Sequence, residues 1–173
     1  KPDQGPKIAD QDLFDEIGDW DADAPSNLPV AILSEAERVA CLRLARTPSI
    51  GPVAFRTLIN RYGGASEALA SLPDVFARTG GRTPRIASQE QAVSELEAAE
   101  RMNAAPVFTI EPGYPSLLAM DSHPPPVVYL RGNADLLARP SVAIVGSRKA
   151  SASGLAMARQ LAQGLGAKSI SVV

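Results

Sequence analysis

The sequence predicts an α/β protein, in which a small helical domain precedes the beginning of a doubly wound domain with a parallel sheet. Helix caps and amphipathic stretches fill residues 34–103, whereas short β-rich runs begin after residue 105. An apolar strand, a Gly/Ser/Arg loop, a helix and a second apolar strand then follow in order, which is the unit that opens a doubly wound domain. Because a parallel sheet needs more strands than these, we expect this domain to be incomplete in the chain.

The helical part begins at Ser34, which forms a predicted capping box with Glu37. We expect this first helix to end before Pro48, because proline disfavours helical geometry in the residue that precedes it. Pro52 suits the first turn of a second helix. Gly63 ends that helix, since glycine accepts the left-handed conformation without steric cost.

Proline and glycine also divide the rest of the helical part. We expect two short helices at residues 66–71 and 73–79, because the second begins with a proline, and a glycine pair at residues 80–81 closes them. Ser88 and Gln91 form a second predicted capping box, which opens a helix to about residue 103.

Four short runs of apolar and β-branched residues predict strands. They are residues 107–110, 127–130, 142–145 and 170–173. The third run is continuously apolar, as expected of a strand that is buried on both faces of a parallel sheet. A helix at about residues 153–165 joins the third run to the fourth.

The composition is that of an ordinary folded protein, with 45% apolar and 21% charged residues among 173. No apolar run approaches the roughly 18 residues of a membrane-spanning helix, so we expect no membrane partner. One cysteine, Cys41, and one histidine, His123, allow neither an internal disulfide nor a Cys/His metal cluster. We therefore expect no metal or other cofactor, and a lone cysteine suits the reducing cytoplasm.

The formal net charge of −2 hides an uneven distribution of charge. Residues 1–30 contain two lysines and eight acids, a net −6, which leaves +4 for residues 31–173. From residue 136 to the end there are five basic residues and no acidic one. The charge of the whole chain therefore does not exclude a nucleic-acid partner.

The first 33 residues are interpreted as an acidic, flexible tail, because they show no helical or strand period. Their apolar residues Leu13, Phe14, Ile17 and Trp20 are able to dock on the body of the protein or on a partner. The tail lacks a basic stretch followed by an apolar one, which argues against secretion.

Residues 47–54 form a tight, glycine-containing turn between two predicted helices, and this turn resembles a helix-hairpin-helix motif. Backbone N–H groups of such a turn contact a DNA phosphate without reading bases, which points to Ile50 and Gly51. Nearby arginines favour this interpretation, whereas nearby glutamates and the lack of a basic residue in the turn oppose it. The alternative is a helical module that binds proteins or only packs.

The loop after the third strand carries each kind of group that binds phosphate. Gly146 is expected to let the backbone turn sharply, and Ser147 and Ser151 supply hydroxyl groups. The helix that follows presents free N–H groups with a partial positive charge. Arg148 offers a planar fork for phosphate oxygens, with Lys149 beside it as a second cation. The alternative is a solvated loop with a serine helix cap.

No catalytic constellation is evident in the sequence. The loop lacks the glycine spacing of dinucleotide-binding proteins and of P-loop proteins. His123 lies in a proline-rich turn, and Cys41 lies in an apolar helical stretch where a small core residue is expected. We therefore expect a binding protein rather than an enzyme.

Three further stretches occur in a fixed order in the second half of the chain. They are Gly-Tyr-Pro-Ser-Leu-Leu at 113–118, Pro-Pro-Val-Val-Tyr-Leu-Arg-Gly-Asn at 125–133, and Val-Ala-Ile-Val-Gly-Ser-Arg at 142–148. The third continues with Ser151 and Gly154. Together with the helical domain, these motifs resemble the DNA-processing protein A family (DprA, also called Smf) over about residues 34–173. A tyrosine of the family's third motif is replaced by Ser153.

The resemblance implies a SAM-like helical domain at residues 34–104 and an extended Rossmann-like domain that starts at residue 105 and is truncated at residue 173. It implies a cytoplasmic, non-catalytic protein that binds and protects single-stranded DNA in natural transformation, helps to load the RecA recombinase and forms a homodimer through the Rossmann-like domain. The family's DNA-binding loop corresponds to Gly146, Ser147 and Arg148.

Two other functions fit parts of the sequence. Rossmann-like folds with a Gly-Ser loop also bind mononucleotides and cleave N-glycosidic bonds, so a nucleoside monophosphate N-glycosidase is one alternative. It would need a general acid or base that this sequence does not show. In the other alternative, residues 34–103 form a protein-interaction module and the Rossmann-like part is a passive scaffold.

Overall fold

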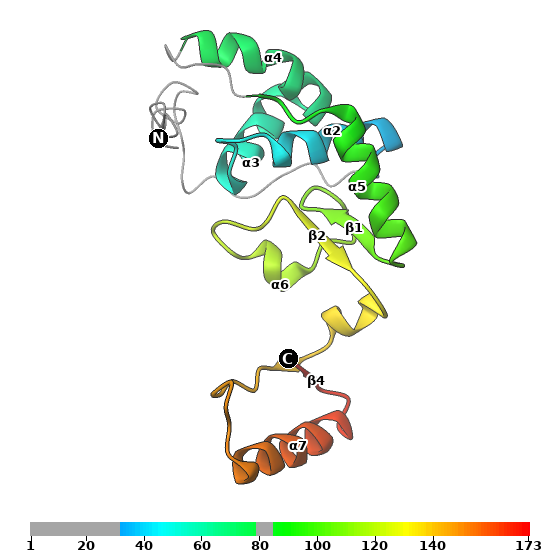
Figure 1. Cartoon of the computed structure of the whole chain (residues 1–173), viewed down its shortest axis with the longest axis vertical. Helices are drawn as coiled ribbons and strands as arrows, with labels where there is room; N and C mark the ends of the chain where they lie inside the picture. Colours follow the sequence, from blue (N-terminus) through cyan, green and yellow to red (C-terminus); the bar gives the residue numbers. More distant parts are fainter. Residues whose placement is uncertain (1–31, 79–84) are drawn as a thin grey trace, which may run out of the picture. The chain divides into compact units, whose positions relative to one another are not determined.

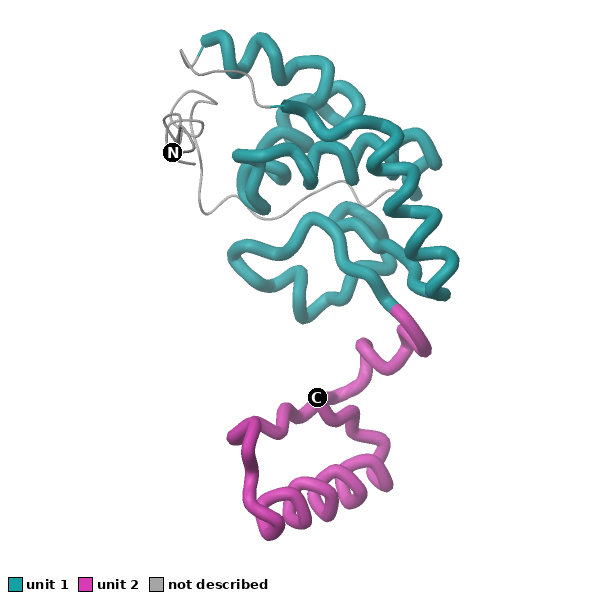
Figure 2. The backbone as a smooth tube through the Cα atoms, viewed as in Figure 1, with its two compact units in different colours: residues 1–130 teal, residues 131–173 magenta. Residues whose placement is uncertain are grey.

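A computed structural model of the chain describes residues 32–78 and 85–173. The chain divides into two compact units, unit 1 at residues 1–130 and unit 2 at residues 131–173 (Figure 2). Residues 1–31 of the predicted tail, with Trp20, and the glycine pair at residues 80–81 lie outside the described residues. Of the two described residues of that tail, Ile32 is exposed, whereas Leu33 is partly buried against the core.

Helices dominate the first part of unit 1 (Figure 1). They are α2 (Glu35–Arg46), α3 (Pro52–Tyr62), α4 (Ala65–Arg78) and α5 (Gln89–Arg101). The predicted starts of α2, α3 and α5 are confirmed, and Gly63 ends α3 with a left-handed φ of 81°. The capping box of α5 is reciprocal: the hydroxyl of Ser88 accepts from the Gln91 N–H, and the Gln91 side chain accepts from the Ser88 N–H, both at 3.2 Å.

The predicted capping box at the start of α2 forms only in part. Ser34 accepts a hydrogen bond from the Glu37 N–H at 3.2 Å, but the Glu37 side chain does not return to Ser34. Its carboxylate accepts instead from the N–H of Ala65 and from the N–H and hydroxyl of Ser66. Glu37 therefore accepts from backbone N–H groups at the start of α4 that have no partner within the helix, and it links α2 to α4.

The two short helices predicted at residues 66–71 and 73–79 are wrong, because α4 is one continuous helix with Pro73 inside it. A proline within a helix costs about 3 kcal/mol, since it lacks the N–H group and crowds the preceding turn. Leu72 and Phe76 lie on either side of Pro73 and are both fully buried. Burial of large apolar side chains, worth about 1.5–3 kcal/mol each, offsets the cost of the proline.

The rest of unit 1 is an antiparallel pair of strands, β1 (Ala105–Phe108) and β2 (Val127–Leu130), with the short helix α6 (Ser116–Ala119) between them. The predicted strand at residues 127–130 is confirmed, whereas the one predicted at residues 107–110 begins and ends two residues earlier. Phe108 pairs with Val127, and the backbone continues past β1 to place Ile110 in the core.

Unit 1 has one core that the helices and the strand pair share. Its largest fully buried side chains are Phe55, Phe76, Phe108, Leu42, Leu44, Leu58, Ile59, Leu72 and Cys41. Phe108 and Ile110 belong to the same cluster as the helical residues. The strand pair thus packs against the helices. The boundary between a helical domain and a Rossmann-like domain at residues 104 and 105 stays a prediction.

Unit 2 holds the predicted strand–loop–helix–strand arrangement. Its elements are the 3-10 helix η1 (Ala134–Ala138), β3 (Ser141–Val142), α7 (Ala152–Gly166) and β4 (Ser171–Val172). The two strands are parallel, and Ser141 pairs with Ser171. The observed fold is thus a helical domain followed by a small α/β region that is consistent with part of a Rossmann-like domain.

The strand predicted at residues 142–145 is shorter than expected and is not buried on both faces. β3 ends at Val142, which is exposed, and the side chain of Val145 is 89% exposed. Burial on both faces requires a layer on each side of the sheet. Within unit 2, β3 pairs with β4 and α7 packs on β4.

Candidate nucleic-acid interface

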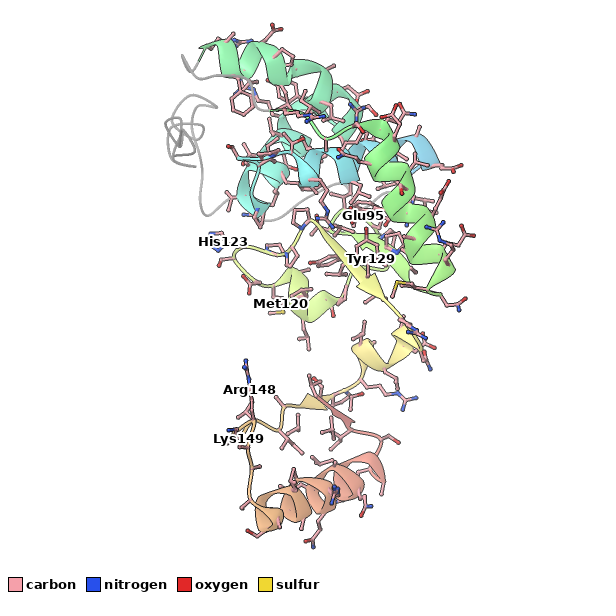
Figure 3. All side chains as sticks on the ribbon, in the orientation of Figure 1. Glu95, Met120, His123, Tyr129, Arg148 and Lys149 are labelled. Atoms are coloured by element: carbon pink, nitrogen blue, oxygen red, sulfur yellow. The ribbon has the colours of Figure 1, made fainter. Side chains whose placement is uncertain are left out.

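The loop that the sequence identified lies between β3 and α7, at the carboxyl edge of the parallel strand pair. Ligands of open α/β sheets bind outside this edge. Figure 3 shows the side chains of Arg148 and Lys149 extending outward from the loop. The strand pairing thus brings both cations to the edge where a ligand of this fold is expected.

Arg148 and Lys149 are both exposed. The Ser147 hydroxyl accepts a hydrogen bond from the Lys149 N–H at 3.2 Å, which fixes the local bend of the loop. All residues of unit 2 are described, and they form no ion pair with one another. The unit has six basic residues and one acid, Asp135, which gives it a formal net charge of +5. The two cations are therefore available to an anionic ligand.

Ser151 begins the helix that follows the loop. Its hydroxyl accepts from the Gly154 N–H at 3.2 Å and lies 3.0 Å from the Ser153 hydroxyl. This cap leaves the N–H groups of Ala152 and Ser153 without an intrahelical partner. No acidic residue occupies the first turn of α7, so the partial positive charge of the helix terminus is not neutralised there.

Gly146 follows β3 and does not use the left-handed conformation that glycine permits. Its φ lies outside the left-handed region, and an added Cβ would have no heavy atom within 4 Å. This φ does not require a glycine, and the space beside the Gly146 backbone is open.

The helix-hairpin-helix-like turn is only partly free to contact a phosphate. The Ile50 side chain is 6% exposed and belongs to the core, and its N–H donates to the Thr47 carbonyl at 3.2 Å. Gly51 precedes α3 with an extended backbone and no side-chain cap. Ile50 is therefore a packing residue, and the unpartnered donors of this turn belong to Gly51 and the first turn of α3. Ser49 adopts a left-handed φ of 69° that the sequence did not indicate.

Two arginines near this turn bind other parts of unit 1. The single N–H of the Arg46 Nε is shared between the two carboxylate oxygens of Glu95, at 3.1 and 3.2 Å, and the Nη2 donates to the same carboxylate at 2.7 Å. Glu95 also accepts from the Tyr129 hydroxyl at 2.5 Å, and Figure 3 shows these two side chains adjacent. Arg43 donates to the Ala87 carbonyl at 2.9 Å. These arginines hold α2, α5 and β2 together, which weakens their support for a DNA contact.

The pKa values of this cluster follow from the same contacts. The hydrogen bond from Arg46 lowers the pKa of Glu95. Burial, together with the hydrogen bond to Glu95, raises the pKa of Tyr129 to about 12. At neutral pH the carboxylate of Glu95 is thus charged and the hydroxyl of Tyr129 retains its proton, which is the combination that their hydrogen bond requires.

The remaining candidate residues occupy the positions that the sequence predicted. Cys41 is fully buried in the core, and this burial raises the pKa of its thiol. His123 is exposed, and its Nδ1 lies 2.7 Å from the neighbouring Ser122 hydroxyl. Residues 32–78 and 85–173 contain no group of three His, Cys, Asp or Glu side chains that could hold a metal ion. Within the same ranges, no helix has the length and apolar character that a membrane crossing requires.

Comparison with known proteins places this architecture among DNA-processing proteins that mediate recombination. Residues 35–98 match the family model of the DprA-like N-terminal HHH domain, and residues 105–173 match that of DNA recombination-mediator protein A. The chain therefore belongs to the DNA-processing protein A family, as its sequence motifs predicted. No curated protein matches the chain at a significant level.

Proposed function

We propose that this chain binds single-stranded DNA as part of a recombination mediator, and that the loop from Gly146 to Ser151 holds phosphates of the DNA backbone. The observation that carries this proposal is the pair of exposed cations, Arg148 and Lys149, at the carboxyl edge of unit 2. Neither cation has an acidic partner within the unit, and the start of α7 lies beside them.

Each group of the loop has a distinct part in holding a phosphate. Arg148 offers two parallel N–H donors to the phosphate oxygens, and Lys149 adds a second positive charge. The hydroxyl of Ser147 accepts a backbone hydrogen bond and keeps its own proton to donate. Such contacts neutralise the backbone and do not read bases, so we expect weak sequence preference and strong salt dependence.

Membership of the family supports several finer proposals. We propose that the protein protects incoming single-stranded DNA during natural transformation, helps to load RecA, acts in the cytoplasm and dimerises through the Rossmann-like domain. We further propose a secondary phosphate contact at Gly51, where α3 begins without a side-chain cap. The family's domains are those of a recombination mediator, which supports binding without catalysis.

The test is the substitution Arg148→Ala in the full-length protein, with binding of a fluorescent oligo-dT measured by anisotropy across a salt titration. Hydrogen bonds to charged groups contribute about 1.5–3 kcal/mol, so we expect affinity at low salt to fall by about tenfold or more. The log–log salt slope should become shallower by about 0.7 for each phosphate that the variant no longer neutralises.

A matched control is Arg101→Ala, which removes one exposed arginine from α5, where it pairs with Glu97 at 3.7 Å. This variant should bind oligo-dT as the unaltered protein does. If Arg148→Ala also leaves affinity and salt slope unchanged, the loop is not the DNA site.

A further inference from the structure

A second pair of cations lies at the opposite edge of unit 2. Arg139 comes two residues before β3, and Lys168 comes three residues before β4. Because Ser141 and Ser171 pair in a parallel register, the chain enters both strands at the same edge of the sheet. Both side chains are exposed. We call Arg139 and Lys168 the amino-edge pair.

Backbone hydrogen bonds fix the position of the amino-edge pair. The N–H of Arg139 donates to the Leu136 carbonyl at 3.3 Å, and the same carbonyl accepts from the Ser171 hydroxyl at 3.1 Å. These bonds join the segment that carries Arg139 to the start of β4.

The end of α7 is closed just as firmly. The N–H of Ile170 donates to the Leu165 carbonyl at 3.1 Å, and Ser169 takes a left-handed φ of 60°. This is the pattern of a Schellman motif, and it holds the backbone of Lys168 at the helix terminus. The amino-edge pair is thus carried by ordered backbone at both of its residues.

Helix α7 connects the two edges and presents a further cation between them. Its 15 residues span roughly 22 Å at 1.5 Å per residue. Ala158 and Ala162 are partly buried along α7, whereas Arg159 lies outside that stripe and is exposed. The helix contains no acidic residue, and the one acid of unit 2, Asp135, lies on η1.

We propose that single-stranded DNA held at Arg148 and Lys149 continues along α7, past Arg159, to the amino-edge pair. This inference rests on the proposed function and extends its binding site from one loop to a path along the unit. A polyanion gains affinity for each phosphate that a cation neutralises, and the path offers cations at its start, middle and end with no acid on α7. Arg159, Arg139 and Lys168 are then phosphate contacts of the longer strand.

The experiment compares two lengths of oligo-dT on the full-length protein, one short enough to occupy only the loop and one long enough to follow α7. The variants are Arg159→Ala and the double substitution Arg139→Ala with Lys168→Ala. We expect each to weaken binding of the long oligonucleotide several-fold and to reduce its salt slope by about 0.7 for each phosphate left without its cation. Binding of the short oligonucleotide should stay unchanged.

The controls separate this inference from the proposed function and from stability. Arg148→Ala should weaken binding of both lengths; if it does so while the other variants bind the long strand normally, the path is wrong and the loop site stands. Gln160→Ala, an exposed neutral change on α7, should have no effect. A cation at a helix end also stabilises the helix, so thermal melting is measured alongside, and Lys168→Arg should retain the salt slope. Equal losses of affinity for both lengths would overturn the path, since they indicate a general effect of charge.

Discussion

In unit 1 arginine side chains bind other parts of the fold, whereas in unit 2 the corresponding cations face solvent. Arg38 and Arg46 form ion pairs with Glu111 and Glu95, and each pair joins elements that are far apart in the sequence. Arg148 has no such partner within unit 2. The number of basic residues therefore says little about a nucleic-acid surface, because what matters is whether acids of the same unit already neutralise them.

The two units also differ in how their apolar residues are used. Phe108 of unit 1 is fully buried, while Val145 of unit 2 is 89% exposed. Unit 1 has a closed core to which both helices and strands contribute, and unit 2 has a helix on a two-stranded sheet.

The largest effect is expected for Phe108→Ala in unit 1. Removal of a fully buried phenylalanine typically costs about 3–5 kcal/mol, and the helices should lose stability together with the strand pair because Phe108 belongs to their core. Urea denaturation followed by the helical circular-dichroism signal measures this. Val145→Ala in unit 2 is the matched truncation, and it should change stability by less than about 0.5 kcal/mol. A helical signal unaffected by Phe108→Ala would mean that the strand pair and the helices are separate units.

A smaller effect is expected for Arg38→Ala. The Arg38 guanidinium donates to the Glu111 carboxylate and to the Pro106 carbonyl, and it lies 5.4 Å from the centre of the Phe108 ring. Glu111 in turn accepts from the Phe108 N–H at 2.9 Å. Because the pair is partly buried and its loss leaves the Glu111 carboxylate without its cation, we expect the variant to lose about 2 kcal/mol of stability.

A double-mutant cycle with Glu111→Gln isolates the coupling between the two side chains. Coupling near zero would show that Arg38 contributes through its contacts with the Pro106 carbonyl and the Phe108 ring.

The smallest effect, for Glu95→Gln, depends on pH. The pKa of Glu95 is lowered in the folded state, chiefly by the hydrogen bond from Arg46. Its stabilising contribution is thus present above the unfolded-state value of 4.5 and is lost as the pH falls through the folded-state value. Since the side chain is one-third exposed, we expect Glu95→Gln to cost about 1 kcal/mol at pH 7.

Thermal melting from pH 7 down to pH 3 tests this prediction. The curves of the variant and the unaltered protein should converge in acid. A difference that stays constant over the whole range would show that the charge of Glu95 does not stabilise unit 1.

Local signals account for the parts of the fold that the sequence predicted well. The helix starts at Ser34, Pro52 and Ser88 depend on a serine hydroxyl or on the fixed φ of proline, which act within one turn. Pro73 is the exception, because the helix that contains it is held by Leu72 and its neighbours in a core that no local rule describes.

The candidate site also contains residues that the sequence alone indicates and one residue whose role depends on packing. Arg148, Lys149 and Ser151 could be identified from the sequence, because their residue types and their place after an apolar strand suffice to indicate a phosphate loop. Ile50 could not be excluded from the sequence, since its burial and the use of its N–H depend on the packed turn.

The order of elements, the family motifs and the acid-free stretch from residue 136 to the end could all be predicted without a structure, because they depend only on which residues follow one another. Which charges are neutralised depends on how the helices pack. Arg46 and Glu95 are far apart in the sequence and meet only when α2 packs on α5. Ion pairs form only between groups a few ångströms apart. The packing of the chain therefore decides which arginines form ion pairs within unit 1 and which cations of unit 2 stay exposed.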